Sequence, residues 1–311
     1  MAHERSTAEW SAVTSSSAQS RKPATYGDDV AVVTVTYSPG ETIDRFLDTL
    51  VTATERTPKV VLADNGSTDG APERAAERPN VELAPTGGNL GYGRAANHGV
   101  ERLGDEVGWV VVANPDLEWT PGSLDVLLAA AERWPRGGAF GPLIREPAGD
   151  VYPSARLLPS LGRGVGHAVL GKVWSDNPWS RAYRQSDTAV VERTAGWLSG
   201  SCQLFRREAF DSVGGFDPRY FMYFEDVDLG DRLARAGWLN VYVPSAEVMH
   251  VGGASTSTAS ERMLAAHHRS AYRYLSDRHQ GPAWAPLRFA LRTGLNARYR
   301  WELRGSRRTG G

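Results

Sequence analysis

Three carboxylates follow directly on a run of bulky apolar side chains in the second half of the sequence. Glu225, Asp226 and Asp228 come after Phe-Met-Tyr-Phe at residues 221–224. Because carboxylates are expensive to bury beside apolar rings, such a cluster indicates either a helix cap or an acid–base site. A cap requires one acid, which stabilises a helix start by roughly 0.3–1 kcal/mol. Three acids exceed that need, so the cluster is a candidate for general-base catalysis.

Two further acids stand where predicted strands end. Asp64 follows the strand 60–63, and Asp116 closes an Asn-Pro-Asp turn after the strand 109–113. The Asp64 carboxylate is suited to accept a hydrogen bond from a pyrimidine N–H or a ribose hydroxyl, whereas residues 67–69 favour turn and cap chemistry. A carboxylate held rigidly at the position of Asp116 can bind a metal ion on a diphosphate. The alternative at both places is an ordinary turn.

A glycine-rich segment at residues 89–97 opens a predicted helix. Its sequence, Asn-Leu-Gly-Tyr-Gly-Arg-Ala-Ala-Asn, allows close backbone approach, and the N–H groups of a helix start favour an anion. Arg94 and Asn97 are therefore candidates for nucleotide contacts, with a purely structural loop as the equal alternative. His250, in an apolar run before Gly-Gly and a Ser/Thr run, is either a core residue or a metal ligand that favours Mn²⁺.

The pattern of apolar runs predicts an α/β fold. In the first half, β-branched strands alternate with amphipathic helices, which indicates a parallel sheet wound right-handed. In such a sheet ligands bind at the carboxyl ends of the strands, here at the loops 37–40, 64–69 and 114–118. A less regular stretch at 145–195 is expected to lie over the site. The predicted strands are 30–37, 60–63, 81–83, 109–113, 198–205 and 240–243, and the predicted helices are 41–54, 70–78, 91–103, 207–213 and 228–236.

Composition narrows the classes of function. The 311 residues carry a net charge of −1, which offers no global attraction for nucleic acid. The single cysteine, Cys202, excludes an intrachain disulfide and is interpreted as a buried structural thiol. No apolar run reaches the length of a membrane span and the polar N-terminus lacks a signal-peptide core, so a cytoplasmic location is expected. Residues 1–27, rich in Ser, Ala and Thr, are predicted to be a disordered tail.

The last part of the sequence combines arginine with aromatic residues. Residues 284–311 contain seven arginines and one glutamate, interleaved with Trp, Phe, Leu and Tyr. Such a segment suits an anionic membrane surface, and the alternative is a solvated helix packed on the domain.

The order of the motifs resembles that of family 2 glycosyltransferases with the GT-A fold. The sequence contains, in the family's order, Asp-Asn-Gly-Ser-Thr-Asp-Gly (64–70), Asn-Leu-Gly-Tyr-Gly (89–93), Asn-Pro-Asp (114–116), Gly-x-x-x-Gly-Ser (196–201), Gly-Gly-Phe-Asp (214–217) and Phe-Glu-Asp-Val-Asp (224–228). Within the family the chain looks most similar to bacterial rhamnosyltransferases that act on polyprenyl-diphosphate-linked N-acetylglucosamine. The resemblance spans about residues 30–275.

The resemblance implies an α/β fold with a mostly parallel, Rossmann-like sheet flanked by helices and a C-terminal helical segment. It divides the chain into a nucleotide-sugar half at 28–120, an acceptor and catalytic half at 121–275, and the basic-aromatic segment at 276–311.

The resemblance also assigns the acids of the cluster. Asp226 matches the general base, Glu225 is the second candidate, and Asp228 is the member expected to cap the helix. The acceptor is expected to lie against Trp197, Gly200 and Ser201.

Metal and nucleotide contacts are implied in the same way. Asp116 matches the last acid of an Asp-x-Asp metal motif in which Asn114 replaces the first acid, and His250 matches a histidine that joins the metal shell. The expected cofactor is Mg²⁺ or Mn²⁺. The expected nucleotide-sugar contacts are Thr36, Tyr37, Asp64, Asn65, Arg94, Asn97 and Asn114.

The implied reaction is the transfer, with inversion, of a deoxyhexose such as L-rhamnose from dTDP-L-rhamnose to a lipid-linked N-acetylglucosamine in cell-wall polysaccharide synthesis. The implied partners are the nucleotide sugar, the lipid-linked acceptor and the inner face of the plasma membrane, with a homo-oligomer left open. The alternatives are a different nucleotide sugar or acceptor, a sugar nucleotidyltransferase, and a non-catalytic binding module. A nucleotidyltransferase is expected to carry a basic glycine-rich loop after the first strand, and Ser-Pro-Gly at 38–40 lacks one.

Overall fold

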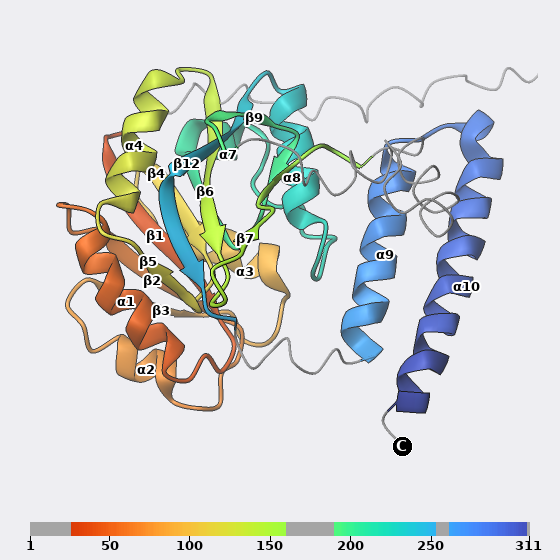
Figure 1. Ribbon diagram of the computed structural model, residues 1–311, viewed down its shortest axis with the longest axis horizontal. Helices are drawn as coiled ribbons and strands as arrows, with labels where there is room; N and C mark the ends of the chain where they lie inside the picture. Colours follow the sequence, from red (N-terminus) through yellow and green to blue (C-terminus); the bar gives the residue numbers. More distant parts are fainter. Residues whose placement is uncertain (1–25, 160–189, 253–260, 310–311) are drawn as a thin grey trace, which may run out of the picture.

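The computed structural model of the chain describes residues 26–159, 190–252 and 261–309. Most of the predicted tail at 1–27, and the larger part of the irregular stretch at 145–195, therefore lie outside the described residues. The described part contains a central sheet with helices on both faces and two further helices near the C-terminus (Figure 1).

The predicted parallel sheet forms from the first half of the chain. Its strands are β1 (Asp29–Thr36), β2 (Lys59–Asp64), β3 (Val81–Pro85) and β4 (Val107–Ala113), paired in the order β3-β2-β1-β4 and all parallel. Alternate residues of β1 face opposite cores: Val30 and Val32 pack in one apolar cluster, and Ala31 and Val33 in the other. β1, β2 and β4 are buried on both faces, as the β-branched runs predicted, whereas the edge strand β3 is only partly buried.

The sheet continues with strands of both directions in the order β4-β11-β6-β12-β5. The strands are β11 (Cys202–Arg206), β6 (Gly137–Arg145), β12 (Leu239–His250) and β5 (Leu117–Trp119). Because β11 is antiparallel to both β4 and β6, and β12 is parallel to β6, the ends of β4 and β12 and the start of β11 meet at one edge. The short strands β7 (Val151–Tyr152) and β9 (Arg193–Ala195) join this sheet, and β8 (Ala155–Arg156) pairs with β10 (Trp197–Leu198) in a separate small sheet.

Six helices of the described part cover the two faces. One apolar cluster unites the sheet with α1 (Thr42–Ala53), α2 (Ala71–Ala75) and α4 (Ser123–Arg133). The other unites it with α3 (Tyr92–Val100), α7 (Arg207–Ser212) and α8 (Glu225–Arg235). Cys202 is 1% exposed in the first cluster, and burial raises the pKa of its thiol, so the interpretation as a structural thiol is confirmed.

Several predicted boundaries were wrong. The strand predicted at 198–205 is interrupted by a turn at 199–201, which separates β10 from β11. The helix predicted to start near Asp228 begins three residues earlier, at Glu225. The helix predicted at 70–78 is confined to α2, and residues 76–80, which include Pro79, form the turn into β3. The strand predicted at 240–243 extends through His250, so this histidine ends β12 and does not follow it.

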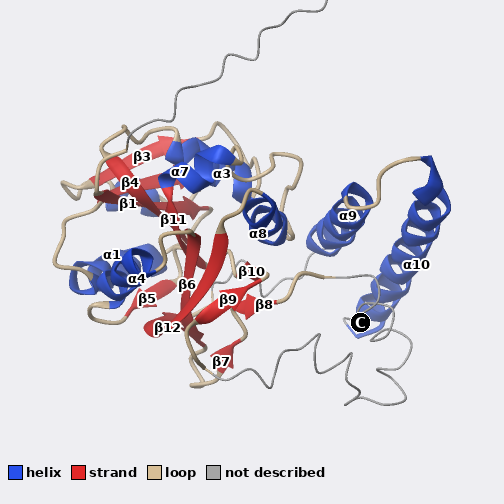
Figure 2. Ribbon diagram, turned by 90° about the horizontal axis from the view of Figure 1, so that it is seen from above, coloured by secondary structure: helices blue, strands red, loops and turns tan. Residues whose placement is uncertain are grey.

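The C-terminal part forms two long helices. These are α9 (Glu261–Asp277) and α10 (Ala285–Thr309), joined by the 3₁₀ turn η1 (Pro282–Trp284). Figures 1 and 2 show the two helices side by side, with α9 next to α8 and α10 on the outside. The helix α9 runs through the proposed division between residues 275 and 276. Within the described ranges, none of the helices combines the length and apolar character required of a membrane span.

Candidate active site

The edge where the strands end brings together segments far apart in the sequence. Thr36 and Asp64 are paired at the ends of β1 and β2. The N–H of Asn114, just after β4, donates to the carbonyl of Ser201 at 2.9 Å. The N–H of Val251, just after β12, donates to the carbonyl of Asp116 at 3.0 Å. The loops predicted to carry function therefore lie around one site.

Asp64 organises the loop that follows β2. Its carboxylate is 8% exposed and accepts hydrogen bonds from the Thr36 hydroxyl at 2.8 Å, from the Ser67 hydroxyl, and from the N–H groups of Gly66 and Ser67 at 3.2 and 3.1 Å. This loop geometry is that of an Asx turn. Thr36 and Asp64 were both expected to contact the nucleotide. In the structure they bind each other, and Asp64 also fixes the loop at 66–67.

Asn65 connects this loop to the glycine-rich segment. Its side-chain amide donates to the carbonyl of Gly91 at 3.3 Å, and its oxygen accepts from the N–H of Leu90 at 3.2 Å. Gly91 has φ of +87°, and a Cβ there would collide with the main chain of Phe221, whose carbonyl accepts from the N–H of Tyr92 at 3.0 Å. Glycine is required at 91 because the catalytic loop approaches so closely.

One of the expected nucleotide contacts, Asn97, points elsewhere. The Asn97 side chain donates to the carbonyl of Phe216 at 2.7 Å and accepts from its N–H at 2.9 Å, so both polar groups serve the fold. This gives Asn97 the structural role that was the alternative. Tyr37 is 53% exposed and Arg94 is exposed on α3, so both remain accessible to a ligand.

Asp116 and His250 face each other across the site. The His250 Nε2 atom lies 3.1 Å from Oδ1 of Asp116, and the two side chains are 26% and 14% exposed, respectively. The hydrogen bond that the His250 ring donates to the Asp116 carboxylate raises the pKa of His250. A carboxylate oxygen and an imidazole nitrogen at this separation are a donor pair suited to Mg²⁺ or Mn²⁺. Within the described ranges no group of three or more His, Cys, Asp or Glu side chains could hold a metal, so a cation here would take its other ligands from phosphate and water.

The acidic cluster occupies the first turn of α8. Tyr223 and Phe224, which precede it, both have φ of 67°, a conformation that L-residues rarely adopt and that marks functional turns. Glu225 and Asp226 follow in helical conformation, and no side chain caps the helix start. The acids are therefore held at the helix N-terminus by backbone geometry.

Asp226 points at the turn between β10 and β11. Its Oδ2 atom accepts a hydrogen bond from the N–H of Gly200 at 3.0 Å, and Oδ1 lies 2.8 Å from the N–H of Val227. A Cβ at Gly200 would lie 3.4 Å from the Asp226 Cβ, so the turn approaches the carboxylate closely. Since the carbonyl of Ser201 in the same turn accepts from the N–H of Asn114, the turn bridges Asp226 and the loop that follows β4. Asp226, Gly200, Ser201 and Asn114 are thus brought together.

Glu225 has a different environment from its neighbour. It is 7% exposed, and its Oε2 atom has no hydrogen-bond partner within the described residues. Burial raises the pKa of both carboxyl groups, and the charge of Asp226 raises the pKa of Glu225 further. The hydrogen bonds from Gly200 and Val227 oppose the rise at Asp226. When the two carboxyl groups share one proton, the proton therefore resides on Glu225, and Asp226 is ionised.

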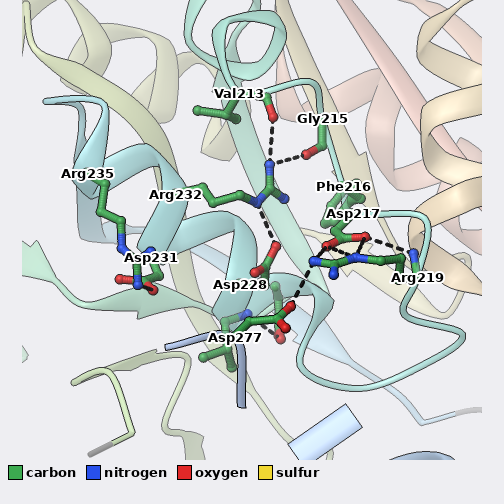
Figure 3. Close-up of polar contacts among 12 residues, drawn as sticks. Val213, Gly215, Phe216, Asp217, Arg219, Asp228, Asp231, Arg232, Arg235 and Asp277 are labelled. Atoms are coloured by element: carbon green, nitrogen blue, oxygen red, sulfur yellow. Dashed lines mark hydrogen bonds and ion pairs between the residues drawn. The ribbon is translucent and has the colours of Figure 1, made fainter. Parts of the chain in front are cut away.

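Asp228 does not cap the helix, contrary to the prediction. Its carboxylate accepts from Nε of Arg232 at 2.6 Å, one helical turn further on (Figure 3). Nη1 of Arg232 in turn donates to the carbonyls of Val213 and Gly215, at 2.7 and 2.8 Å. Close by, Arg219 pairs with Asp217 and Asp277 (Figure 3). Arg232 and Asp228 thus tie α8 to the preceding loop, and the half-exposed Arg219 ties that loop to α9.

Sequence reasoning missed the role of Tyr92. Its hydroxyl donates to the carbonyl of Gly200 at 2.6 Å, and burial raises its pKa, so it stays a neutral donor. It therefore fixes the peptide whose neighbouring N–H binds Asp226. The glycine-rich motif containing Tyr92 drew attention to its glycines, Arg94 and Asn97, but not to this hydroxyl, because a contact across 108 residues leaves no local signal.

The expected acceptor residue Trp197 lies on the other side of this turn. Its indole N–H donates to the carbonyl of Leu157 at 3.2 Å, and its Cβ lies close to Gly230 of α8, where a side chain would meet it at 2.9 Å. The guanidinium of Arg156 stacks 5.5 Å from the centre of the Trp197 ring. Arg156 is a second residue that the sequence did not single out, because it lies in an irregular stretch.

Comparison with known proteins identifies the class. A family model described as glycosyl transferase family 2 matches residues 31–214, and one described as glycosyl transferase family group 2 matches residues 181–302. The first match covers more than half of the chain, so the protein belongs to glycosyl transferase family 2. The resemblance inferred from the motifs is thereby confirmed.

Individual relatives give a finer likeness. The chain is 59% identical to an N-acetylglucosaminyl-diphospho-decaprenol L-rhamnosyltransferase of Mycobacterium tuberculosis, over 90% of this chain and 95% of the relative. It is 26% identical to the rhamnosyltransferase WbbL of Escherichia coli K12, over 79% and 92% of the two chains. A mannosyltransferase of Pyrobaculum calidifontis, solved in complex with GDP-Man and Mn²⁺, superposes with a TM-score of 0.54 at 20% identity, over 90% of this chain and 75% of that chain. The last likeness confirms the predicted GT-A fold.

Proposed function

We propose that the protein transfers L-rhamnose from dTDP-L-rhamnose, with inversion, to a hydroxyl of N-acetylglucosamine linked through a diphosphate to a polyprenol. The observation that carries the donor sugar and the acceptor is the 59% identity, over almost the whole length of both chains, to a relative named for this transfer. The geometry agrees with a transferase, because a partly buried aspartate lies beside the metal-side loop at the edge where ligands of such sheets bind.

Asp226 is the general base in this proposal. Its ionised carboxylate takes the proton of the acceptor hydroxyl as that oxygen bonds to the anomeric carbon. The bond from the anomeric carbon to the donor diphosphate breaks at the same time, and the nucleoside diphosphate leaves with the bonding electrons. The N–H of Gly200 orients the carboxylate, and the neighbouring turn with Ser201 and Trp197 positions the acceptor.

Asp116 and His250 are the proposed metal ligands. A divalent cation bound there supplies charge neutralisation for the diphosphate of the donor. The loop held by Asp64, with Thr36, Tyr37, Asn65, Arg94 and Asn114, surrounds the proposed nucleotide site. Asn97 is left to its structural contact with Phe216.

The proposed location is the inner face of the plasma membrane, where a polyprenyl-linked acceptor is found. Trp284, Phe289 and Trp301 are large apolar side chains exposed along η1 and α10, and exposed arginines lie between them. Aromatic and arginine side chains mixed along one helix favour the interface of an anionic membrane.

The experiment that tests the function is a screen of activated sugars. The purified protein is mixed with a short-chain polyprenyl-diphosphate N-acetylglucosamine, a divalent cation, and dTDP-rhamnose, UDP-glucose, UDP-galactose or GDP-mannose in turn. We expect that, of the four donors, only dTDP-rhamnose gives release of nucleoside diphosphate and formation of a rhamnosylated lipid. Transfer of a different sugar would refute the donor, and formation of a nucleotide sugar from a sugar phosphate would favour a nucleotidyltransferase.

A further inference from the structure

Arg156 presents, near the proposed base Asp226, a positive charge that no carboxylate of the described residues pairs with. It lies on β8, directly opposite Trp197 of β10 in the small antiparallel sheet. Its guanidinium carbon is 5.5 Å from the centre of the Trp197 ring and 5.4 Å from that of Tyr152. The two rings hold the guanidinium in place, so the charge has a fixed position.

The hydrogen-bonding capacity of this guanidinium is largely unused. Nε donates to the carbonyl of Pro153 at 2.7 Å, and within the described ranges neither terminal nitrogen of Arg156 makes a hydrogen bond or an ion pair. Arg193 by contrast donates to the carbonyl of Ala155, which secures the backbone of β8. The terminal N–H groups of Arg156 are therefore free to bind an anion, in a geometry that suits phosphate oxygens.

Arg156 is electrostatically close to Asp226 without being its partner. Its charge opposes the rise in the pKa of Asp226, yet no ion pair joins the two groups. A cation and the proposed base thus lie near each other without neutralising each other. A sugar that presents a hydroxyl to Asp226 and stacks near Trp197 carries its anomeric substituent one ring-width away. For a lipid-linked acceptor that substituent is a diphosphate.

We propose that Arg156 binds the diphosphate of the lipid-linked acceptor and so selects acceptors that carry a phosphorylated anomeric carbon. The inference rests on the proposed function for the identity of the acceptor. The donor diphosphate belongs at Asp116 and His250, at the ends of β4 and β12, whereas Arg156 is part of the sheet that carries Trp197. The two diphosphates of the reaction then have separate cations.

The test compares two acceptors on two variants. Binding of a short-chain polyprenyl-diphosphate N-acetylglucosamine, and of octyl N-acetylglucosaminide, is measured by tryptophan fluorescence without donor, and KM and kcat are measured with it. For Arg156→Gln we expect the Kd and KM of the diphosphate acceptor to rise about 10- to 100-fold, as for the loss of a charge-assisted hydrogen bond. The Kd of the uncharged acceptor and the KM of dTDP-rhamnose should stay within about twofold. Arg156→Lys keeps the positive charge but lacks the planar, two-pronged N–H donors of a guanidinium. Its Kd and KM for the diphosphate acceptor should therefore rise less than those of Arg156→Gln.

Arg136→Gln is the matched control. It removes an exposed arginine whose side chain donates to the carbonyl of Gly237. Arg136 directly precedes β6, so it lies at the opposite end of that strand from the site. The substitution should leave both acceptors unaffected. Equal weakening of both acceptors by Arg156→Gln, a shifted pH profile of kcat with both, or unchanged binding of the diphosphate acceptor would overturn the inference. If wild-type protein binds the diphosphate acceptor but transfers no rhamnose, the proposed function fails while the binding comparison still decides the role of Arg156.

Discussion

Glu225 and Asp226 are adjacent carboxylates with opposite surroundings. Glu225 is buried, and one of its oxygens has no hydrogen-bond partner among the described residues. Asp226 accepts from the Gly200 N–H and lies near the guanidinium of Arg156. Two neighbouring acids whose environments push their pKa values apart divide the roles of proton holder and base. This difference, more than the number of acids, distinguishes the cluster from a helix cap.

Replacing Tyr92 by phenylalanine tests how the base is positioned. The change removes only the hydroxyl that donates to the Gly200 carbonyl. We expect kcat to fall about 2- to 10-fold, corresponding to one neutral hydrogen bond, while the Kd of dTDP-rhamnose stays the same. The pH profile of kcat should move to higher pH, because a less well oriented Gly200 N–H stabilises the Asp226 carboxylate less.

Tyr220→Phe is the control for this variant. The Tyr220 hydroxyl is buried and has no hydrogen-bond partner within the described part of the chain, so its loss should leave both kcat and the pH profile intact. Equal effects of the two substitutions would mean that Tyr92 contributes only to general packing.

Asp116→Ala should weaken the metal-dependent part of donor binding. In wild type, addition of Mn²⁺ or Mg²⁺ should lower the Kd of dTDP-rhamnose, because the Asp116 carboxylate and His250 are the residues that would hold the cation, and the cation would neutralise the charge of the diphosphate. In the variant, titration calorimetry should show a donor affinity that no longer responds to the cation. Asp48→Ala, which removes a carboxylate paired with Arg78 on the surface, is the control. Full activity of wild type in excess chelator would contradict the metal role.

The start of α8 links local backbone geometry to the stability of the fold. Tyr223 and Phe224 place the helix start so that two acids lie side by side in a buried turn, and Asp228 and Arg232 secure the helix from behind. A raised pKa of Glu225 means that the folded protein binds its proton more tightly than the unfolded chain does. The contribution of Glu225 to the free energy of unfolding is therefore fully present below its ordinary pKa of 4.5. It is lost as the pH rises from that value through the raised pKa of the folded state.

Glu225→Gln should remove this pH dependence. The amide cannot ionise, so the variant should gain melting temperature relative to wild type at pH 8 and differ little from it at pH 4.5. Thermal melting at both pH values measures the difference, with the exposed Glu132→Gln as the control. A variant that loses stability more at pH 8 than at pH 4.5 would show that Glu225 is ionised in the fold.

The helices and strands differ in how far sequence could predict them. The β-branched runs of β1, β2 and β4 are buried on both faces, and such runs have few other stable arrangements. β6 (Gly137–Arg145) was not predicted because three glycines and one proline interrupt its apolar pattern, and β5 was not predicted because it has only three residues. The turn at 199–201 looked like the middle of a strand, since only tertiary contacts to Asp226 and Tyr92 define it.

The site was predictable to the same limited extent. Asp64, Asp116 and Asp226 stand next to apolar runs, so their places at strand and helix ends could be read locally. Tyr92 and Arg156 act through partners more than 35 residues away, and no local pattern marks them. Asn97 was misleading for the converse reason, since an amide side chain on a helix suits a ligand and a loop carbonyl equally.

Contacts from α9 connect the C-terminal helices to α8 and to the loop at 220–224 that precedes it. Ser270 of α9 donates to the carbonyl of Met222 at 2.9 Å, and Arg278 pairs with Asp231 of α8 at 2.6 Å. Tyr274 packs in a small apolar cluster with Tyr220 and Val227. A membrane contact made by α10 would thus be transmitted to the acceptor side of the site through α9.

Charge reversal on α10 tests that contact. The full-length variant Arg292→Glu with Arg300→Glu changes two exposed arginines. We expect its flotation with vesicles containing anionic phosphatidylglycerol to fall more than about tenfold, since each basic residue at such a surface contributes about 1 kcal/mol. Neutral phosphatidylcholine vesicles should bind neither protein. The control Arg102→Glu with Arg136→Glu makes the same charge change on the α/β part, and equal losses would place the contact elsewhere.

Asp226→Asn tests the central claim most directly. The amide keeps the size of the side chain but cannot take a proton, so transfer of rhamnose from dTDP-rhamnose to polyprenyl-diphosphate N-acetylglucosamine should slow by roughly 10²–10⁴-fold. The Kd of dTDP-rhamnose, measured in parallel with the cation present, should remain within about twofold. The wild-type product should have the anomeric configuration opposite to that of the donor. Turnover by Asp226→Asn at the wild-type rate, or a product that retains the donor configuration, would contradict the account.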